Sequence, residues 1–387
     1  MEFSFALPTQ IEFGVGMLEK TGRIALDRGA HRVLLVADRG IVSTGIPDRV
    51  RESLEKEGLA VTPFQKIVAN PRIADCEEGA RLAQDRKIDF VVAVGGGSSM
   101  DTAKAIAGML GHHTTDFSVI QYPAAYTEES LPLICIPTTA GTGSEVSTCG
   151  VVTDEKTKTK VFCYDPKCHA TVAICDPSVL YGLPDSIAAA TAVDALTHAI
   201  EGFVAKCTNH VTECFGIRAV ELLAANIREY VYNRTPESCE AVMLGSLFAG
   251  IAFGYSDTCA VHSLSETIGG EYDIPHGVAN AVFLANVTEY SIPGNMQKYV
   301  RIAQAMGIRG EDKTDREICE VMVEEIRKLV KDLNIPLFRD LEGVREEDFE
   351  RLAQKCEVHL SAADNPRKIG FHDFLEILHI TYDEVRR

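Results

Sequence analysis

Unbroken apolar runs alternate with helix-like segments in the first half of the chain. The runs cover residues 32–37, 89–94 and 131–136. Continuous apolar runs are typical of strands that are buried on both faces, as in a parallel sheet. Segments with helical periodicity, at 46–58 and 75–87, lie between the first two runs. This alternation predicts an open α/β sheet with right-handed crossovers.

The pattern changes after about residue 183, where the strand-like runs stop. Pro184, Asp185 and Ser186 form a helix start signal. Apolar residues then recur at helical spacing in segments that we expect to be helices: 187–200, 211–230, 238–253, 280–290 and 318–333. The sequence therefore predicts two domains, an α/β domain at 1–183 and an all-helical domain at 184–387.

Composition and charge narrow the function classes. A length of 387 residues suits two domains of roughly 150 residues or more. The formal net charge of −18 disfavours partners such as nucleic acid and anionic membrane surfaces. The N-terminus lacks the basic start and apolar stretch of a signal peptide, and no apolar run reaches about 18 residues. We therefore expect a cytoplasmic protein that does not cross a membrane.

Twelve cysteines are spread along the chain without a Cys-x-x-Cys pair. A zinc ribbon or a thioredoxin-like site needs such pairs, and a disulfide framework belongs to small secreted domains. We therefore interpret most of the cysteines as small buried hydrophobic residues.

A glycine-rich loop follows the second apolar run. Gly95, Gly96 and Gly97 precede Ser98 and a helix-like segment. Glycines let an anion approach the backbone, and the N–H groups and dipole of a helix N-terminus attract it. This pattern favours pyrophosphate binding, although the spacing is not Gly-x-Gly-x-x-Gly. A tight strand-to-helix turn without a ligand is the alternative.

Two further strand ends carry polar residues. Thr138, Thr139 and Thr142 follow the third run, in a loop that can hydrogen-bond ribose, phosphate or a carboxamide. Asp38 ends the first run, where a carboxylate can accept from ribose hydroxyls and repel a 2′-phosphate, which favours NAD over NADP. An Asp that caps the next turn is the alternative. Because ligands lie at the carboxyl ends of parallel strands, the three ends together predict a dinucleotide site.

One carboxylate and three imidazoles in the second half are candidate metal ligands. Asp194 and His198 are four residues apart, so they share one helix face. A buried pair of this kind is costly unless it binds something charged, or forms an Asp–His hydrogen bond. His262 begins another helical stretch, and His276 lies in a Pro-His-Gly turn at a predicted helix start. This N/O donor set suits Fe²⁺ or Zn²⁺, with Mn²⁺, Co²⁺ and Ni²⁺ also compatible.

The other histidines lie mostly in polar segments, and we interpret them as surface residues: 31, 112, 113, 169, 210, 359, 372 and 379.

Together these segments resemble the iron-containing, group III alcohol dehydrogenase family. The resemblance runs from about Phe5 to Arg367. It implies an N-terminal Rossmann-like domain, a C-terminal helical domain of the dehydroquinate synthase-like architecture, and a metal held by the four candidate ligands. It also implies NAD(H) contacts from one set of residues: Asp38, Asn70, Ser98, Thr138, Thr142 and Lys160.

The chain departs from the family at one position of the helix that begins near His262. Glu266 stands where many members have a second histidine, which is generally given a role in proton passage or nicotinamide contact. A carboxylate can also relay a proton, but it brings negative charge near a divalent metal. Phe253 resembles an aromatic residue that lines the family's substrate pocket, with a plain core Phe as the alternative.

The expected function is hydride transfer between NAD(H) and a small alcohol or aldehyde, as in an alcohol dehydrogenase or aldehyde reductase, with a divalent ion as Lewis acid. The family resemblance suggests a homodimer or higher homo-oligomer. One alternative is a glycerol or polyol dehydrogenase of the same superfamily, normally zinc-dependent with fewer histidine ligands. A dehydroquinate synthase-like lyase would need a basic pocket for a phosphorylated substrate. A non-enzymatic metal or nucleotide sensor is the remaining class.

Overall fold

The described part of the chain, residues 2–67, 70–157, 159–310 and 312–385 of a computed structural model, forms two compact units. One, here called the sheet unit, contains Ala6–Thr139 and Gly143–Gly182. The other, the helical unit, contains Met1–Phe5, Ala140–Thr142 and Leu183–Arg387.

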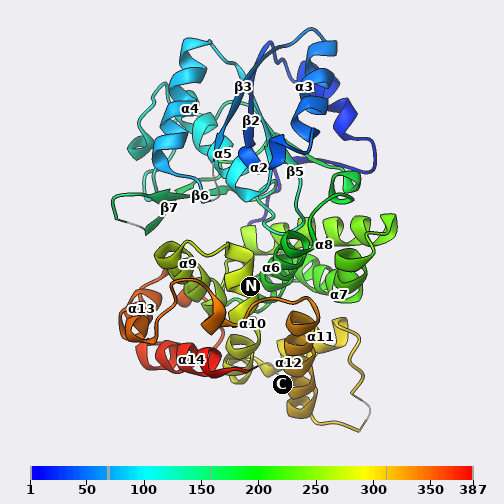
Figure 1. The fold of residues 1–387 in the computed structure, drawn as a ribbon, viewed down its shortest axis with the longest axis vertical. Helices are drawn as coiled ribbons and strands as arrows, with labels where there is room; N and C mark the ends of the chain where they lie inside the picture. The colour runs from blue at the N-terminus through cyan, green and yellow to red at the C-terminus, as the bar shows by residue number, and fades with distance from the viewer. Residues whose placement is uncertain (1, 68–69, 158, 311, 386–387) are drawn as a thin grey trace. The chain divides into compact units, whose positions relative to one another are not determined.

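The sheet unit contains a six-stranded parallel sheet in the order β1-β8-β5-β4-β2-β3 (Figure 1). Its strands are β1 (Gln10–Phe13), β2 (Arg32–Asp38), β3 (Ala60–Ile67), β4 (Phe90–Gly95), β5 (Leu133–Pro137) and β8 (Val172–Cys175). The three apolar runs predicted as strands are β2, β4 and β5, and every residue of β4 and β5 is buried. The prediction of a parallel sheet is confirmed.

Helices flank the sheet. They are α1 (Thr21–Asp27), α2 (Arg39–Val42), α3 (Ile46–Lys56), α4 (Ile73–Asp85) and α5 (Gly97–Gly111). Helix α1 packs on α3, and α4 packs on α5. Figure 1 shows α3 on one side of β2 and β3, and α4 and α5 on the other. The predicted α/β fold class of this half is confirmed.

The strands β6 (Cys149–Asp154) and β7 (Thr159–Tyr164) form a separate antiparallel pair. The sequence pattern did not predict this pair, because both strands mix polar and apolar residues on a half-buried surface.

The direction in which successive strands are added to the sheet reverses after β3, so that β2 lies between β3 and β4. Strand β3 lies on one side of β2 and β4 on the other, so the chain leaves β2 and returns past it. Ligands of open α/β sheets bind outside the carboxyl ends of the strands at such a switch point. β2 ends at Asp38 and β4 at Gly95. The topology therefore places two of the predicted cofactor segments side by side.

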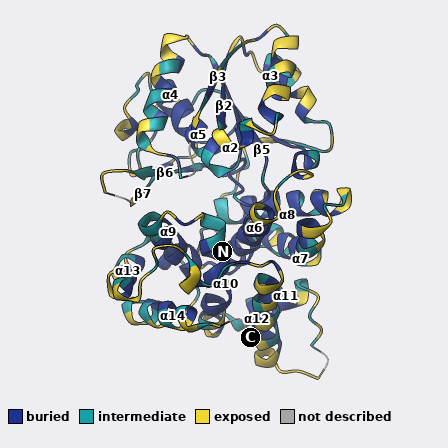
Figure 2. Ribbon diagram, viewed as in Figure 1, coloured by how far each residue is buried: buried dark blue, intermediate teal, exposed yellow. Residues whose placement is uncertain are grey.

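The helical unit is built from α6 (Asp185–Val204), α7 (His210–Tyr232), α8 (Pro236–Gly254), α9 (Ala260–Tyr272), α10 (His276–Ser291), α11 (Met296–Ala305), α12 (Asp315–Asp332), α13 (Phe349–Glu357) and α14 (Phe371–Asp383). Helix α6 packs against α7, α8 and α10, and α9 packs against α10 and α13. Figure 2 shows α6 and α10 largely in the dark blue of buried residues. The predicted helical second half is confirmed.

Two helices of this unit, α6 and α8, are long and apolar enough to cross a membrane by length and composition. Their most apolar windows have mean hydropathies of 1.3 and 1.2 and are 89% and 61% buried inside the unit. Both helices contain polar residues, so neither is the unbroken apolar run of about 18 residues that the sequence analysis expected to be absent. A helix that is apolar all round is also the form taken by a core helix, and the chain shows no clear membrane protein character.

All twelve cysteines are free. Nine of them are buried, which confirms for these nine the interpretation as small core residues. Cys149 is half-buried, and Cys207 and Cys214 are exposed.

Candidate functional site

The helix α6 supplies two of the predicted metal ligands. Asp194 and His198 lie one turn apart, and both side chains are buried. The helix is buried from Ala192 to Val204, so the carboxylate and the imidazole share an apolar setting. Two polar groups in such a setting need a partner that satisfies them.

The other two predicted ligands come from neighbouring helices. His262 lies in the first turn of α9 and is buried, whereas His276 begins α10 and keeps 37% of its side chain exposed. The predicted helix start at His276 is confirmed, with Pro275 as the N-cap. Gly277 permits the close approach of α10 to α6, since a Cβ there would lie 2.5 Å from the Ala190 carbonyl oxygen.

The structure brings the four predicted ligands together. Their ligand atoms all lie within 4.8 Å of one another. Nε2 of His198 lies 2.9 Å from Nε2 of His262, and Nε2 of His276 lies 3.6 Å from Oδ1 of Asp194. One carboxylate oxygen and three imidazole nitrogens therefore surround one point.

Hydrogen bonds fix which ring nitrogens face that point. Nδ1 of His198 donates to the carbonyl oxygen of Gly141 at 3.2 Å, and Nδ1 of His262 donates to Oε2 of Glu201 at 2.5 Å. Each ring then directs an unprotonated Nε2 at the other. Two lone pairs 2.9 Å apart repel unless a cation lies between them. The donor set therefore fits a divalent metal ion with nitrogen and oxygen ligands.

The pKa values of His198 and Asp194 suit that interpretation. Burial lowers the pKa of His198 to about 3, against the attraction of Asp194, so this imidazole is neutral at pH 7. Burial raises the pKa of Asp194, but the imidazoles of His198, His276 and His262 outweigh it and the net shift is downward. In His262 burial lowers the pKa, but the Glu201 carboxylate outweighs it and the net shift is upward. A neutral imidazole and an ionised carboxylate are the protonation states that bind a metal.

Asn280 is a member of the cluster that the sequence reasoning missed. Its Nδ2 lies 2.6 Å from Oδ1 of Asp194, 3.2 Å from Nε2 of His262 and 3.1 Å from Nε2 of His276. Its Oδ1 is buried and has no hydrogen-bond partner. A spacing of four residues after His276 on one helix is the signal that could have indicated Asn280.

Phe253 and Glu266, the two predicted catalytic residues, both lie in this unit. The ring of Phe253, in the last turn of α8, stacks on the ring of His198 with centroids 4.2 Å apart. Glu266 lies in α9, and its Oε2 accepts a hydrogen bond of 2.9 Å from Nε2 of His359. The interpretation of His359 as a surface residue is wrong, because its side chain is 17% exposed and paired with this carboxylate.

The first glycine-rich loop of the sheet unit joins β4 to α5. Gly96 is the N-cap of α5, and Gly97 and Ser98 form its first turn, so the free N–H groups of the helix start at these residues. Gly95 has a φ of 150°, which only glycine adopts without strain. This geometry is that of an anion-binding helix N-terminus.

Asp38 makes contacts that bear on both of its predicted roles. Its Oδ1 accepts from the backbone N–H groups of Gly40 and Ile41, so it caps α2, as the alternative interpretation expects. Its Oδ2 accepts from Oγ of Ser99 at 3.0 Å, and this bond joins the end of β2 to the first turn of α5. The sequence reasoning missed Ser99. Capping and a role toward ribose are compatible, because the carboxylate lies at the switch point.

The residues predicted in the second loop divide between the two units. Thr138 and Thr139 follow β5 in the sheet unit, and the N–H of Thr138 donates to the Gly95 carbonyl oxygen at 3.0 Å. Thr142 belongs to the helical unit, in the short segment whose Gly141 accepts from His198.

The two remaining predicted cofactor residues meet beside the antiparallel pair. Nζ of Lys160, in β7, donates to Oδ1 of Asn70 at 3.0 Å and to Oγ1 of Thr153 at 3.1 Å. These two hydrogen bonds hold the positively charged ammonium group of Lys160 in a defined place in the sheet unit.

Two charged residues of α5, the buried Lys104 and the half-buried Asp101, hold the segment that follows the second loop. Nζ of Lys104 donates to the carbonyl oxygens of Ser147 and Cys149 at 2.9 and 2.7 Å. Oγ of Ser144 donates to Oδ1 of Asp101 at 2.6 Å. The helix that begins at the glycine-rich loop thus also fixes the next loop, and the sequence reasoning missed both charged residues.

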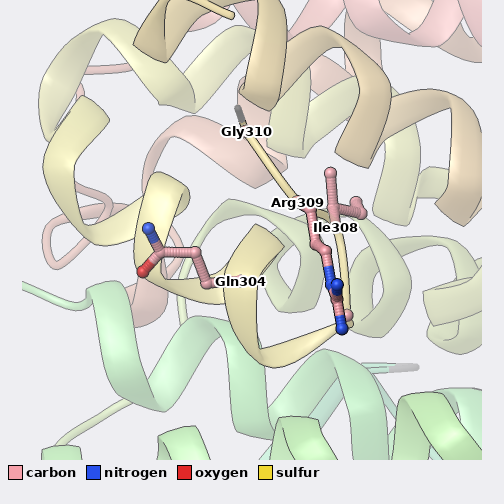
Figure 3. A pocket seen from close by; sticks show the side chains of 5 residues that line it. Gln304, Ile308, Arg309 and Gly310 are labelled. Atoms are coloured by element: carbon pink, nitrogen blue, oxygen red, sulfur yellow. The ribbon is translucent and has the colours of Figure 1, made fainter. Parts of the chain in front are cut away.

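A surface pocket of about 330 Å³ lies away from these residues, beside the end of α11. Figure 3 shows Gln304 on a helix and Ile308, Arg309 and Gly310 along the segment beside it. The described residues that line it are Gln304, Gly307, Ile308, Arg309 and Gly310, and none of these five carries a carboxylate, thiol or imidazole.

The models of two known families match the chain. One, described as iron-containing alcohol dehydrogenase, matches residues 8–177, and the other, the C-terminal part of the Fe-containing alcohol dehydrogenase family, matches residues 188–382. The chain belongs to the iron-containing alcohol dehydrogenase family. The resemblance indicated by its motifs is confirmed, and the protein is an oxidoreductase of the alcohol dehydrogenase type. The family depends on NAD and iron.

Relatives with known names cover almost the whole enzyme. The choline dehydrogenase of Bacillus subtilis (strain 168) is 36% identical over 95% of this chain and 92% of its own length. The lactaldehyde reductase of Escherichia coli (strain K12) is 35% identical over 92% of this chain and 93% of its own length.

Solved structures show the same fold. A crystal structure of a 1,3-propanediol oxidoreductase, 32% identical, superposes with a TM-score of 0.94 and covers 98% of this chain and 100% of its own. The sulfoacetaldehyde reductase of Bifidobacterium kashiwanohense, solved in complex with NAD⁺, is 27% identical, has a TM-score of 0.89 and covers 99% of both chains.

Proposed function

We propose that this enzyme transfers hydride between NAD(H) and a small polar alcohol or aldehyde, with Fe²⁺ or another divalent ion held by Asp194, His198, His262 and His276. The convergence of these four ligand atoms within 4.8 Å is the observation that carries the proposal. Two roles follow for the chain: residues 1–183 form the NAD(H) domain and residues 184–387 the metal domain.

When bound, the metal ion supplies Lewis acidity toward the substrate oxygen. The chain's own residues supply position. The hydrogen bonds from Nδ1 of His198 and Nδ1 of His262 hold these two rings in place. The stacked ring of Phe253 covers one face of His198. We assign Phe253 to the wall of the substrate site, where its apolar ring excludes water from the reacting atoms.

The cofactor contacts are assigned to the switch point of the sheet. The first turn of α5 binds the pyrophosphate through backbone N–H groups, and Asp38 accepts from the ribose hydroxyls. The other cofactor contacts are assigned to the remaining members of the predicted set: Asn70, Gly96, Gly97, Ser98, Thr138, Thr139, Thr142 and Lys160.

A proton must leave the substrate separately from the hydride, and we assign its path to Glu266. Burial raises the pKa of this carboxyl, but the hydrogen bond and the charge of His359 outweigh it and lower the pKa to about 2. The group is therefore ionised at working pH, and His359 keeps it oriented. The pair takes the place that the family usually gives to a second histidine.

We expect Glu266→Gln to lower turnover and to change the response of stability to acid. The ionised carboxylate stabilises the folded state fully above its ordinary pKa of 4.5, and this contribution is lost as pH falls toward 2. Between pH 6 and pH 3 the wild type should lose about 2 kcal/mol more unfolding free energy than the variant, at about 1.4 kcal/mol per pKa unit. Denaturant unfolding and steady-state rates at both pH values measure the two effects.

His359→Ala is the matched variant, because it removes the partner and leaves the carboxylate. It should raise the pKa of Glu266 and share the flatter acid response. Turnover of Glu266→Gln equal to that of the wild type across pH would remove Glu266 from the proton path, whatever its part in stability.

The substrate is assigned from chemistry that named relatives share. Choline, lactaldehyde and 1,3-propanediol, which appear in the names of relatives, are short molecules with a polar group near the reacting carbon. An anaerobic screen of short aldehydes, diols, amino alcohols and hydroxy acids with Fe²⁺ tests this, with NADH and NADPH compared in parallel. We expect stoichiometric NADH consumption with at least one small polar aldehyde.

Each other outcome of the screen points elsewhere. Preference for glycerol with Zn²⁺ indicates the polyol dehydrogenase alternative. Turnover without net NADH consumption indicates a lyase, and no turnover with any substrate class indicates a sensor. Preference for NADPH contradicts the role of Asp38.

We further propose that the enzyme is a cytoplasmic homodimer or higher homo-oligomer. The family membership supports this assignment. Size-exclusion chromatography with light scattering measures the assembly directly.

A further inference from the structure

The carboxylate of Glu201 lies under the first turn of α9 and is 3% exposed. Its Oε1 accepts from the backbone N–H of Val261 at 2.7 Å, and its Oε2 accepts from the N–H of Cys259 at 2.9 Å. The third donor is Nδ1 of His262, 2.5 Å from Oε2. One buried side chain of α6 therefore holds both the start of α9 and one ring of the metal cluster.

This arrangement decides which nitrogen of His262 is available. The imidazole of a neutral histidine carries one proton, and a carboxylate accepts it at Nδ1. Nε2 is then unprotonated and faces Nε2 of His198 at 2.9 Å. We propose that Glu201 is a positioning residue for the metal centre, which fixes the tautomer and the orientation of His262 so that its Nε2 binds the ion. This inference rests on the proposed metal site.

The position of Glu201 in the fold supports a role toward the metal as well as toward the helix. It follows Asp194 by seven residues and His198 by three, so all three lie on the face of α6 that meets α9 and α10. The N-cap residue Cys259 makes no side-chain capping bond, and Glu201 satisfies the N–H groups there instead. A carboxylate also adds negative charge that balances a divalent cation, which a neutral cap cannot do.

Glu201→Gln separates these roles. Glutamine has one carbonyl oxygen for three N–H donors, and it lacks the negative charge that holds the proton of His262 at Nδ1. The tautomer that is protonated at Nε2 therefore gains population. A protonated Nε2 cannot bind a metal. We therefore expect the Kd for Co²⁺ to rise roughly 10- to 100-fold, the usual cost of losing such a partner. The visible absorption of bound Co²⁺ should also change its intensity and band positions.

The measurement uses the full chain, stripped of metal with a chelator and titrated with Co²⁺. Glu213→Gln is the matched control, because Glu213 is a half-buried carboxylate of the same unit that pairs with Lys298 and Arg301 and touches no ligand of the cluster. It should lower the melting temperature and leave the Co²⁺ Kd and spectrum unchanged. If Glu201→Gln does not fold, Glu201→Asp replaces it. The aspartate side chain is one methylene shorter, so its carboxylate lies about 1.5 Å farther from Nδ1 of His262.

Each outcome has one meaning. Weaker Co²⁺ binding with an altered spectrum in the Glu201 variant, and wild-type binding in the control, supports the positioning role. A Glu201 variant that loses only thermal stability and binds Co²⁺ like the wild type reduces Glu201 to a helix cap and leaves the proposed function intact. A wild-type chain that binds no Co²⁺ overturns this inference and the proposed metal site together.

Discussion

Asp194→Asn should give a folded enzyme with little bound metal and a kcat/KM at least about 1000-fold lower, which corresponds to about 4 kcal/mol of transition-state stabilisation. Asp194 is the anionic member of the ligand set, beside three imidazoles. Asparagine keeps the shape and can still accept the hydrogen bond from Asn280, so the fold is preserved while the charge is lost. Metal content by plasma mass spectrometry and kcat/KM measure the result.

Asp185→Asn is the matched control for this variant. Asp185 begins the same helix and pairs with Arg234 at the surface, with 69% of its side chain exposed. The control should keep its metal and its rate. If Asp194→Asn retains one metal per chain and most of its activity, the four residues are a buried hydrogen-bonded cluster and the ion binds elsewhere.

The three strands that could be predicted are long and almost wholly buried, whereas β8 is just as buried but has only four residues and was not predicted. The apolar runs at 32–37, 89–94 and 131–136 lie within two residues of the ends of β2, β4 and β5. Strand β3 escaped prediction because it pairs with β2 alone, has only two buried residues and contains Pro63. The parallel sheet follows from hydrophobic continuity, whereas an edge strand carries a mixed pattern.

The metal ligands could be predicted in part from spacing and in part only from resemblance. The four-residue interval between Asp194 and His198 indicates a shared helix face. The meeting of α6 with α9 and α10 depends on tertiary packing, which no local spacing encodes. Glu201 and Asn280 lie at helical intervals from known candidates, yet only the folded helices show that their polar atoms face the cluster.

His359 shows the limit of composition as a guide. The polar segment around it predicts a surface position, and its neighbours Val358 and Leu360 are indeed exposed in the structure. The turn after α13 instead directs its ring to Glu266, ninety-three residues earlier in the chain. A partner so far away in the sequence leaves no local signal. Only the folded structure shows that Glu266, which stands where the family usually has a histidine, is paired with His359.

Gly95→Ala should weaken NAD(H) binding by at least about 100-fold, the equivalent of roughly 3 kcal/mol. The residue has a φ of 150°, a region that costs other residues about 1–3 kcal/mol. An added Cβ would lie 2.3 Å from Oγ of Ser99 and 2.9 Å from Oδ2 of Asp38. These two atoms form the bond that joins β2 to α5, so the methyl group displaces the ribose acceptor and the start of the phosphate-binding helix together.

Gly58→Ala isolates this steric effect from backbone strain. Gly58 also has a positive φ, 81°, but an added Cβ meets nothing within 4 Å, and the residue follows α3, away from the switch point. It should lose about 1 kcal/mol of stability and bind NADH normally in a fluorescence titration. Both variants place an alanine at a positive φ. A loss of NADH affinity in Gly95→Ala alone therefore assigns the cofactor to the β2–β4 switch point. Equal affinities in the two variants would place the nucleotide on another edge of the sheet.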